Sequence, residues 1–236
     1  MHHREFPQIR QAGENSMLIY LAATATPQVS LQVQWLTTEI KRQLGGLLLE
    51  VIPSYHSILV VYDFLQLDHS QLMLCLVDLL EQLKTQQQLA HPTEQSGKLI
   101  ELPCYYSTES GPDLAAVASM HQMSVSEVIQ LHSSMLYQVY AIGFAPGFAY
   151  LGWIDERIAT PRLKSPRAKV PAGSVAIADR QTAVYPSTSP GGWHLLGHCP
   201  LPLFDLTKEP VMPFSIGDSV KFVSIERPEY LRLGGQ

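Results

Sequence analysis

The sequence predicts an α+β protein, with a small two-layer α/β domain of split βαβ type followed by a β-barrel or sandwich. Strand-like and helix-like apolar runs alternate from residue 17 to residue 89. Prolines and glycines concentrate further on, since residues 141–236 hold 11 of the 17 prolines and 10 of the 15 glycines. The short strand-like pieces between these turn residues are typical of a barrel or sandwich. The polar stretch HPTEQSGK divides the two patterns, so we expect domains at 1–96 and 97–236.

The first domain has the predicted order strand, helix, strand, strand, helix. MLIYLA is a short apolar strand, and Thr26 and Pro27 then supply a helix N-cap and first helical residue. A Gly-Gly pair ends that helix, and LLLEVI and SILVVYDF follow as strands. Residues 69–89 form a helix with leucines on one face. The segment LIELPC either completes this sheet or opens the second domain.

The second domain begins with two predicted helices. Residues 112–121 form the first, and Ser124 with Glu127 forms a capping box ahead of VIQLHSS, the second. MLYQVYAIGF then alternates like a strand. Further short strands are expected at SVAIA, QTAVY, WHLLG and SVKFVSI.

Composition excludes several classes of protein. The chain has 236 residues, 46% of them hydrophobic, which suits globular domains with real cores. Its three cysteines, Cys75, Cys104 and Cys199, lack any CxxC spacing, so neither a disulfide framework nor a zinc site is indicated. The N-terminus has no apolar leader core and no segment has the length that a bilayer requires. A net charge of −5 argues against nucleic acid as a partner. We expect a cytoplasmic protein with no metal site.

Several catalytic motifs are missing. The chain has no GxxxxGK[ST], no GxGxxG after a strand, no GxSxG and no HExxH. A self-contained ATPase or metallohydrolase is therefore not expected.

A basic run is the first positive signal. The segment RIATPRLKSPRAKV holds five cations with no acidic residue between them, and its prolines restrict their movement. Either these cations form an anion-recognising surface or they line a solvated edge strand. They are Arg157, Arg162, Lys164, Arg167 and Lys169.

The segment PSTSPGGW is the second signal. Gly191 and Gly192 can present backbone N–H groups to an anion, and Trp193 can wall a planar ligand, unless the segment is only a tight turn before a core tryptophan. Gln181 and Tyr185 share one strand face, opposite Thr182, and are either an amide-recognising pair or ordinary barrel residues.

One histidine stands near the end of a predicted helix. His132 in VIQLHSS is either a proton donor or a cation stabilised by the helix dipole.

These motifs occur together in the order of a known family. IGFAPGFAYLG, ATPRLKSPRAKVPAGSVAIA, QTAVYPSTSPGGWHLLG and CPLPLFD, with SGPDLAAVA, VIQLHS and PSYHSILVVYD upstream, resemble the family of 5-oxoprolinase B subunits (PxpB/KipI). That family is also called allophanate hydrolase subunit 1-like, with carboxyltransferase subdomains C and D. The resemblance spans residues 13–225 and implies that the second domain is a cyclophilin-like β-barrel.

The resemblance also implies a function. The B subunit works with a C subunit of related barrel fold and with the A subunit, and the complex opens the lactam of 5-oxoproline to glutamate at the expense of ATP. ATP would bind through the assembled complex, and the isolated chain would be inactive. The alternative, from the same family, is a KipI-like inhibitor of a sensor histidine kinase.

Roles can then be assigned as hypotheses. His132, Arg167 and Lys169 are the catalytic candidates. The substrate-binding candidates are Arg162, Ser174, Gln181, Tyr185, Gly191, Gly192 and Trp193. The chain departs from the family pattern where Asp179 and Ala183 replace glycine, Ala149 replaces proline, and His198-Cys199 replaces Arg-Thr.

Overall fold

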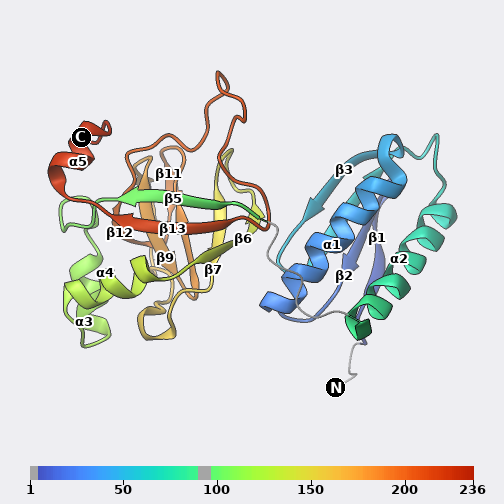
Figure 1. Ribbon diagram of the computed structural model, residues 1–236, viewed down its shortest axis with the longest axis horizontal. Coiled ribbons are helices and arrows are strands. Elements are labelled where there is room, and N and C mark those ends of the chain that lie inside the picture. Colours follow the sequence, from blue (N-terminus) through green and yellow to red (C-terminus); the bar gives the residue numbers. More distant parts are fainter. Residues whose placement is uncertain (1–4, 90–96) are drawn as a thin grey trace. The chain divides into compact units, whose positions relative to one another are not determined.

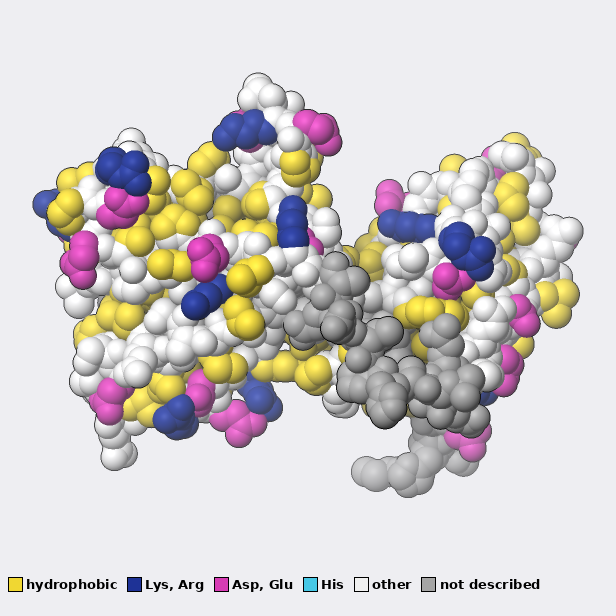
Figure 2. All heavy atoms as spheres, viewed as in Figure 1, with side chains coloured by type: hydrophobic (Ala, Val, Ile, Leu, Met, Phe, Trp, Pro, Cys, Tyr) yellow, Lys and Arg dark blue, Asp and Glu magenta, His cyan; other side chains and the backbone are white. Residues whose placement is uncertain are grey.

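A computed structural model describes residues 5–89 and 97–236 of the chain. The chain divides into two compact units, Met1–Gln95 and Ser96–Gln236. Most of the predicted linker HPTEQSGK lies outside the described residues. Charged side chains of both signs are interspersed on the face shown in Figure 2. Within the described ranges, no helix combines the length and the apolar character needed to cross a membrane.

The first unit is a four-stranded antiparallel sheet with two helices on one face (Figure 1). Its strand order is β1-β2-β4-β3, so β4 lies between β2 and β3. Because β2 and β3 each run antiparallel to β4 and are joined through α1, they form the predicted split βαβ unit. The elements are β1 (Gln8–Gly13), β2 (Ser16–Tyr20), α1 (Pro27–Leu44), η1 (Gly45–Leu47), β3 (Leu48–Pro53), β4 (Ser57–Tyr62) and α2 (His69–Leu89).

Helix α1 begins and ends where its sequence predicts. Thr26 Oγ1 accepts a hydrogen bond from the Val29 amide at 3.2 Å, and Pro27 occupies the first turn. Gly45 ends the helix at φ +40°, a backbone conformation that favours glycine. The buried positions of α1 repeat at helical spacing and meet the sheet and α2 in one core.

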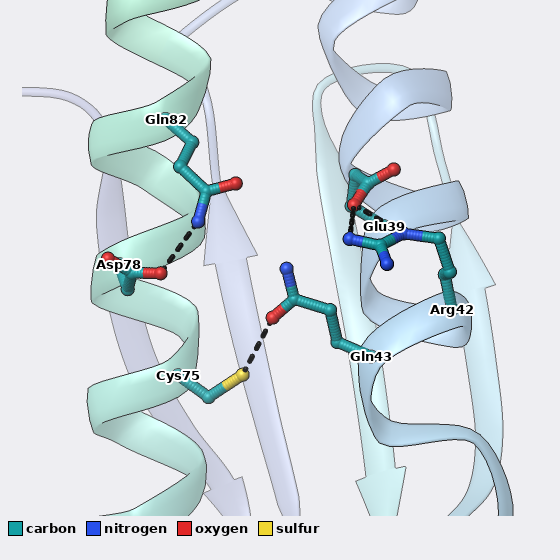
Figure 3. A network of polar contacts seen from close by, with 6 residues as sticks. All are labelled: Glu39, Arg42, Gln43, Cys75, Asp78 and Gln82. Atoms are coloured by element: carbon teal, nitrogen blue, oxygen red, sulfur yellow. Dashed lines mark hydrogen bonds and ion pairs between the residues drawn. The ribbon is translucent and has the colours of Figure 1, made fainter.

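One polar contact joins α1 and α2, and others lie within each helix (Figure 3). The Cys75 thiol on α2 donates to Gln43 Oε1 on α1 at 3.6 Å. Glu39 pairs with Arg42, and Asp78 accepts from Gln82, each within its own helix. Burial raises the pKa of the Cys75 thiol, so this residue is a neutral, structural contact.

The second unit contains a seven-stranded sheet that nearly closes into a barrel. Its order is β12-β9-β10-β7-β6-β13-β5, and a bridge between Tyr105 and His198 joins the two outer strands. The segment LIELPC forms β5 and pairs in parallel with β13, so it opens this unit. The strands are β5 (Leu99–Cys104), β6 (Tyr137–Ile142), β7 (Ala149–Gly152), β9 (Ser174–Ala178), β10 (Gln181–Val184), β12 (His194–His198) and β13 (Ser219–Ser224). A separate two-stranded ribbon consists of β8 (Arg167–Val170) and β11 (Ser189–Gly191).

The helices of this unit are short. Ser124 and Glu127 form the predicted capping box at the start of α4. The helices are α3 (Leu114–Met120), α4 (Val125–Ser134), η2 (Glu156–Ile158) and α5 (Arg227–Arg232).

Both faces of strand β9 are buried, which divides the interior of the unit in two. Val175 and Ile177 belong to the main core, whereas Ala176 and Ala178 face a second apolar cluster. The large members of that second cluster, which we call the aromatic cluster, are Phe148, Tyr150, Tyr185 and Trp193.

Candidate functional site

A cavity of about 600 Å³ in the second unit gathers three of the predicted site residues, Arg167, Lys169 and Ser174. Arg167 and Lys169 stand two residues apart on β8, so their side chains lie on one face of the ribbon. Arg227 from α5 also lines this cavity. We call this space the cationic cavity; its lining also includes Tyr105, Glu109, Leu195, His198 and Tyr230.

Arg167 is held in place by two partners. Its Nη2 donates to Asp113 Oδ1 at 2.6 Å, and its Nη1 lies 3.4 Å from the carbonyl oxygen of Trp193. The Arg167 side chain is 29% exposed, so it is partly shielded from water. Charge-assisted bonds of this kind are stronger and more directional than neutral ones.

Ser174 provides a polar group on the cavity wall. The residue is 2% exposed and lines the cavity. A hydroxyl group can both donate and accept a hydrogen bond, so one on a cavity wall can serve a polar ligand.

His198 stands on the cavity wall. Its Nε2 donates to the Ala172 carbonyl at 2.7 Å, and its Nδ1 lies 3.1 Å from the Tyr230 hydroxyl. Burial lowers the pKa of His198, which favours the neutral ring at neutral pH. Tyr230 in turn stacks on Tyr105 at 4.9 Å between ring centroids, which attaches α5 to this wall.

The aromatic cluster adjoins the cavity and contains two further predicted residues, Tyr185 and Trp193, while a third, Arg162, lies against it. Phe148 is its centre, with ring centroids 4.8 Å from Tyr150, 5.5 Å from Tyr185 and 6.0 Å from Trp193. The Arg162 guanidinium carbon lies 5.9 Å from the centroid of the Trp193 ring, a cation–π distance. Since Arg167 bonds to the carbonyl of Trp193, the cluster and the cavity are neighbours.

The two glycines before Trp193 differ in the space that a side chain would have at each position. A Cβ atom on Gly191 would overlap the Tyr185 hydroxyl, so packing demands glycine at this position. A Cβ atom on Gly192 would make only ordinary contacts, the nearest 3.6 Å from Pro166 Cγ. The Gly192 carbonyl accepts a hydrogen bond from the Leu163 amide at 2.8 Å.

Gln181 begins β10, on the same strand face as Ala183 and Tyr185. It pairs with Ala178 of β9 and Gly152 of β7, and its side chain is half-buried. Thr182 points into the main core, as strand alternation predicts.

His132 lies in the main core, on the other side of the sheet. It is 0% exposed, with Nδ1 2.7 Å from the Tyr106 hydroxyl and Nε2 2.8 Å from Thr182 Oγ1. Burial lowers its pKa to about 3, so the ring is neutral at ordinary pH. Thr182 faces His132 while Tyr185 belongs to the aromatic cluster, so β10 separates this histidine from the cluster. These contacts make His132 a buried link between α4 and β10.

Sequence reasoning missed several residues of this region. Asp113, Tyr105, Arg227 and Tyr230 carry no local signal, because their partners are distant in the chain. Phe144 also escaped notice: it adopts φ +74°, its side chain is 62% exposed, and its ring centroid lies 5.2 Å from that of Phe148. Asp179 adopts φ +52°, a left-handed conformation that aspartate adopts more readily than most residues other than glycine.

Potential metal ligands do not gather in the described ranges. In residues 5–89 and 97–236, no three His, Cys, Asp or Glu residues form a group that could hold a metal ion.

Comparison with known proteins identifies relatives over nearly the whole chain. Residues 7–214 match the family model described as carboxyltransferase domain, subdomain C and D. The chain is 39% identical to the B subunit of 5-oxoprolinase from Bacillus subtilis over 94% of this chain and 95% of that protein. It is 38% identical to the B subunit of 5-oxoprolinase from Escherichia coli O157:H7 over 89% and 93% of the two chains.

Solved structures agree in fold. The crystal structure of TTHA0988 superposes with a TM-score of 0.77 at 31% identity, covering 94% of this chain and 41% of that one. The urea amidolyase of Kluyveromyces lactis has the same fold at 16% identity, with a TM-score of 0.70 over 94% of this chain and 15% of that one. The chain therefore belongs to the carboxyltransferase subdomain C and D family, alongside the proteins named as B subunits of 5-oxoprolinase.

Proposed function

We propose that this chain is the B subunit of an ATP-dependent 5-oxoprolinase, which converts 5-oxo-L-proline to L-glutamate in the cytoplasm. The observation that carries the proposal is the 39% identity to a protein of that name, extending over almost the full length of both chains. A barrel-type C subunit together with the A subunit completes the assembly. The three curated relatives found are all named as B subunits of 5-oxoprolinase, so the kinase-inhibitor alternative gains no support.

The chemistry requires activation of an unreactive amide. Transfer of the γ-phosphoryl group of ATP to the lactam oxygen releases ADP and makes the ring carbon electrophilic. Water then adds to that carbon, the ring C–N bond breaks to give γ-glutamyl phosphate, and a second water releases phosphate and leaves glutamate. Each step develops negative charge on oxygen, which positioned cations stabilise.

The cationic cavity is the part of this chain that fits these needs. Arg167 and Lys169 supply positive charge, and Ser174 supplies a hydroxyl group. For the lactam ring we propose the residues in or beside the aromatic cluster, namely Arg162, Gln181, Tyr185, Gly191, Gly192 and Trp193. We assign no proton transfer to His132, because both of its ring nitrogens already have partners in the core.

ATP is assigned to the assembled complex. The sequence of this chain has no phosphate-binding GxxxxGK[ST] loop, and the proposal routes no nucleotide contact through it.

A leave-one-out reconstitution tests the proposal. This chain is co-expressed with its candidate A and C subunits, and ATP-dependent release of glutamate from 5-oxo-L-proline is measured with all three and with each omitted. We expect release only from the complete set. A stable three-subunit assembly that consumes no 5-oxo-L-proline would contradict the proposal.

A further inference from the structure

Asp113 stands at an N-cap position but does not cap its helix. Aspartate at the N-cap of a helix commonly accepts a hydrogen bond from the first turn. Asp113 precedes α3, yet its side chain makes no such bond. Its carboxylate is committed to partners far along the chain, which indicates another task.

Both carboxylate oxygens of Asp113 are used. Oδ1 accepts from Arg167 Nη2 at 2.6 Å, and Oδ2 accepts from the Leu195 amide at 2.7 Å. The Asp113 amide also donates to the Leu195 carbonyl at 3.1 Å. Since β12 fixes Asp113 at two points, the aspartate is a rigid support for the guanidinium.

This support leaves part of the Arg167 guanidinium available. The group has five N–H donors in a planar fork. One faces Asp113 and one faces the Trp193 carbonyl, while Arg167 also lines the cationic cavity. The fork therefore has donors beyond these two that can serve a ligand there.

Two further groups on the same cavity wall complete a receptor for an oxyanion. Lys169 adds a second cation beside Arg167, and Ser174 adds a hydroxyl group on a residue only 2% exposed. A planar fork, a point charge and one hydroxyl donor suit the two oxygens of a carboxylate.

We propose that Arg167, Lys169 and Ser174 form a carboxylate subsite, and that Asp113 is the positioning residue that orients Arg167 for it. The assignment of that carboxylate to 5-oxo-L-proline rests on the proposed function. The subsite would select lactams that carry a carboxylate next to the ring nitrogen over neutral lactams.

Binding selectivity in the assembled complex tests this. The probes are 5-oxo-L-proline and 5-oxo-L-prolinamide, which share the ring and differ in the negative charge, and calorimetry gives the two dissociation constants without turnover. We expect the wild type to bind the acid at least about tenfold more tightly than the amide, because a charge-assisted pair is lost with the amide. Asp113→Asn and Ser174→Ala should each remove most of that preference.

The matched control is Asp155→Asn. Asp155 also pairs with an arginine, Arg157, at 2.7 Å, but this pair lies outside the cavity lining. The control should keep the wild-type preference. In the catalytic assay, Asp113→Asn should raise KM for 5-oxo-L-proline with little change in kcat.

The experiment distinguishes failure of the carboxylate subsite from failure of the proposed function. Equal binding of acid and amide by the wild type, or an undiminished preference in both Asp113→Asn and Ser174→Ala, would overturn the subsite even if glutamate is released. An equal loss of affinity for both probes in Asp113→Asn would mean that Asp113 only supports the fold. A preference for the acid without glutamate release would instead count against the proposed function alone.

Discussion

His132 Nε2 lies 2.8 Å from Thr182 Oγ1, and that hydroxyl group in turn donates to the Ala176 carbonyl at 3.0 Å. Because the hydroxyl proton is committed to Ala176, the imidazole must donate from Nε2. Nδ1 is then an acceptor, and the Tyr106 hydroxyl, 2.7 Å away, donates to it. The chain of bonds fixes one neutral tautomer of a fully buried histidine.

Acid should therefore lower the stability of the second unit, because His132 resists protonation in the folded state. Its pKa is lowered from 6.5 to about 3 by burial, so between these values the unfolded chain binds the proton and the folded chain does not. The stability that the neutral ring contributes is fully present above the unfolded pKa and is lost as the pH falls. Lowering the pH from 7 to 5 should reduce the free energy of unfolding by about 2 kcal/mol through this group. Urea unfolding at both pH values, followed by the fluorescence of Trp153 and Trp193 in a Trp35→Phe background, measures it.

The control for that experiment is His132→Asn. This variant should be less stable than the wild type at pH 7. Between pH 7 and pH 5 it should lose about 2 kcal/mol less unfolding free energy than the wild type loses, because it lacks the titrating ring. An identical pH dependence in the two proteins would refute the protonation account.

Substitution by alanine should affect stability differently at the neighbouring positions Gly191 and Gly192. Gly191→Ala places a methyl group against the hydroxyl of Tyr185, a side chain only 2% exposed that has no room to retreat. We expect a loss of about 1–3 kcal/mol in unfolding free energy. Gly192→Ala meets only ordinary contacts and should change stability by less than about 0.5 kcal/mol. Thermal unfolding of the pair checks this, and equal effects would contradict the packing argument.

Arg162 offers a test of whether the aromatic cluster takes part in substrate binding. Its side chain is 61% exposed, and its contact with Asp179 is long at 3.9 Å, so Arg162→Ala should scarcely affect stability. If the Trp193 face binds the lactam, the variant should still lower kcat/KM of the assembled complex by at least about tenfold.

Arg180→Ala is the matched control for Arg162→Ala. Arg180 lies over Trp153 at 5.4 Å and is 49% exposed, but it belongs to neither the cavity lining nor the aromatic cluster. Its removal should leave the complex active. Equal activity in the two variants would remove Arg162 from the site.

Local patterns explain how much of the fold was predictable. The Thr26 cap and the Ser124–Glu127 box act within one helical turn, so the sequence shows them directly. Strand β1 was missed because QIRQAG has no apolar alternation, and its position depends on pairing with β2. LIELPC remained ambiguous for a similar reason, since its parallel partner β13 lies at residues 219–224.

The site was predictable only in its residue types. The basic run and the Gly-Gly-Trp turn mark segments that the structure places at the cationic cavity and the aromatic cluster, because unusual composition is visible without a fold. Asp113 was not found, since Arg167 is 54 and Leu195 is 82 residues away from it. His132 shows the converse problem, because helical spacing cannot tell which side of the sheet a side chain will face.

The measurement that tests the central claim most directly is ATP-dependent glutamate release by complexes that carry wild-type, Arg167→Ala or Arg157→Ala forms of this chain. Arg157 pairs with Asp155 outside the cavity and controls for the loss of one surface cation. We predict that Arg167→Ala lowers release at least about a hundredfold, as expected for removal of a charged contact to the reacting substrate, while the complex remains assembled and Arg157→Ala remains active. Wild-type release from an intact Arg167→Ala complex would contradict the account.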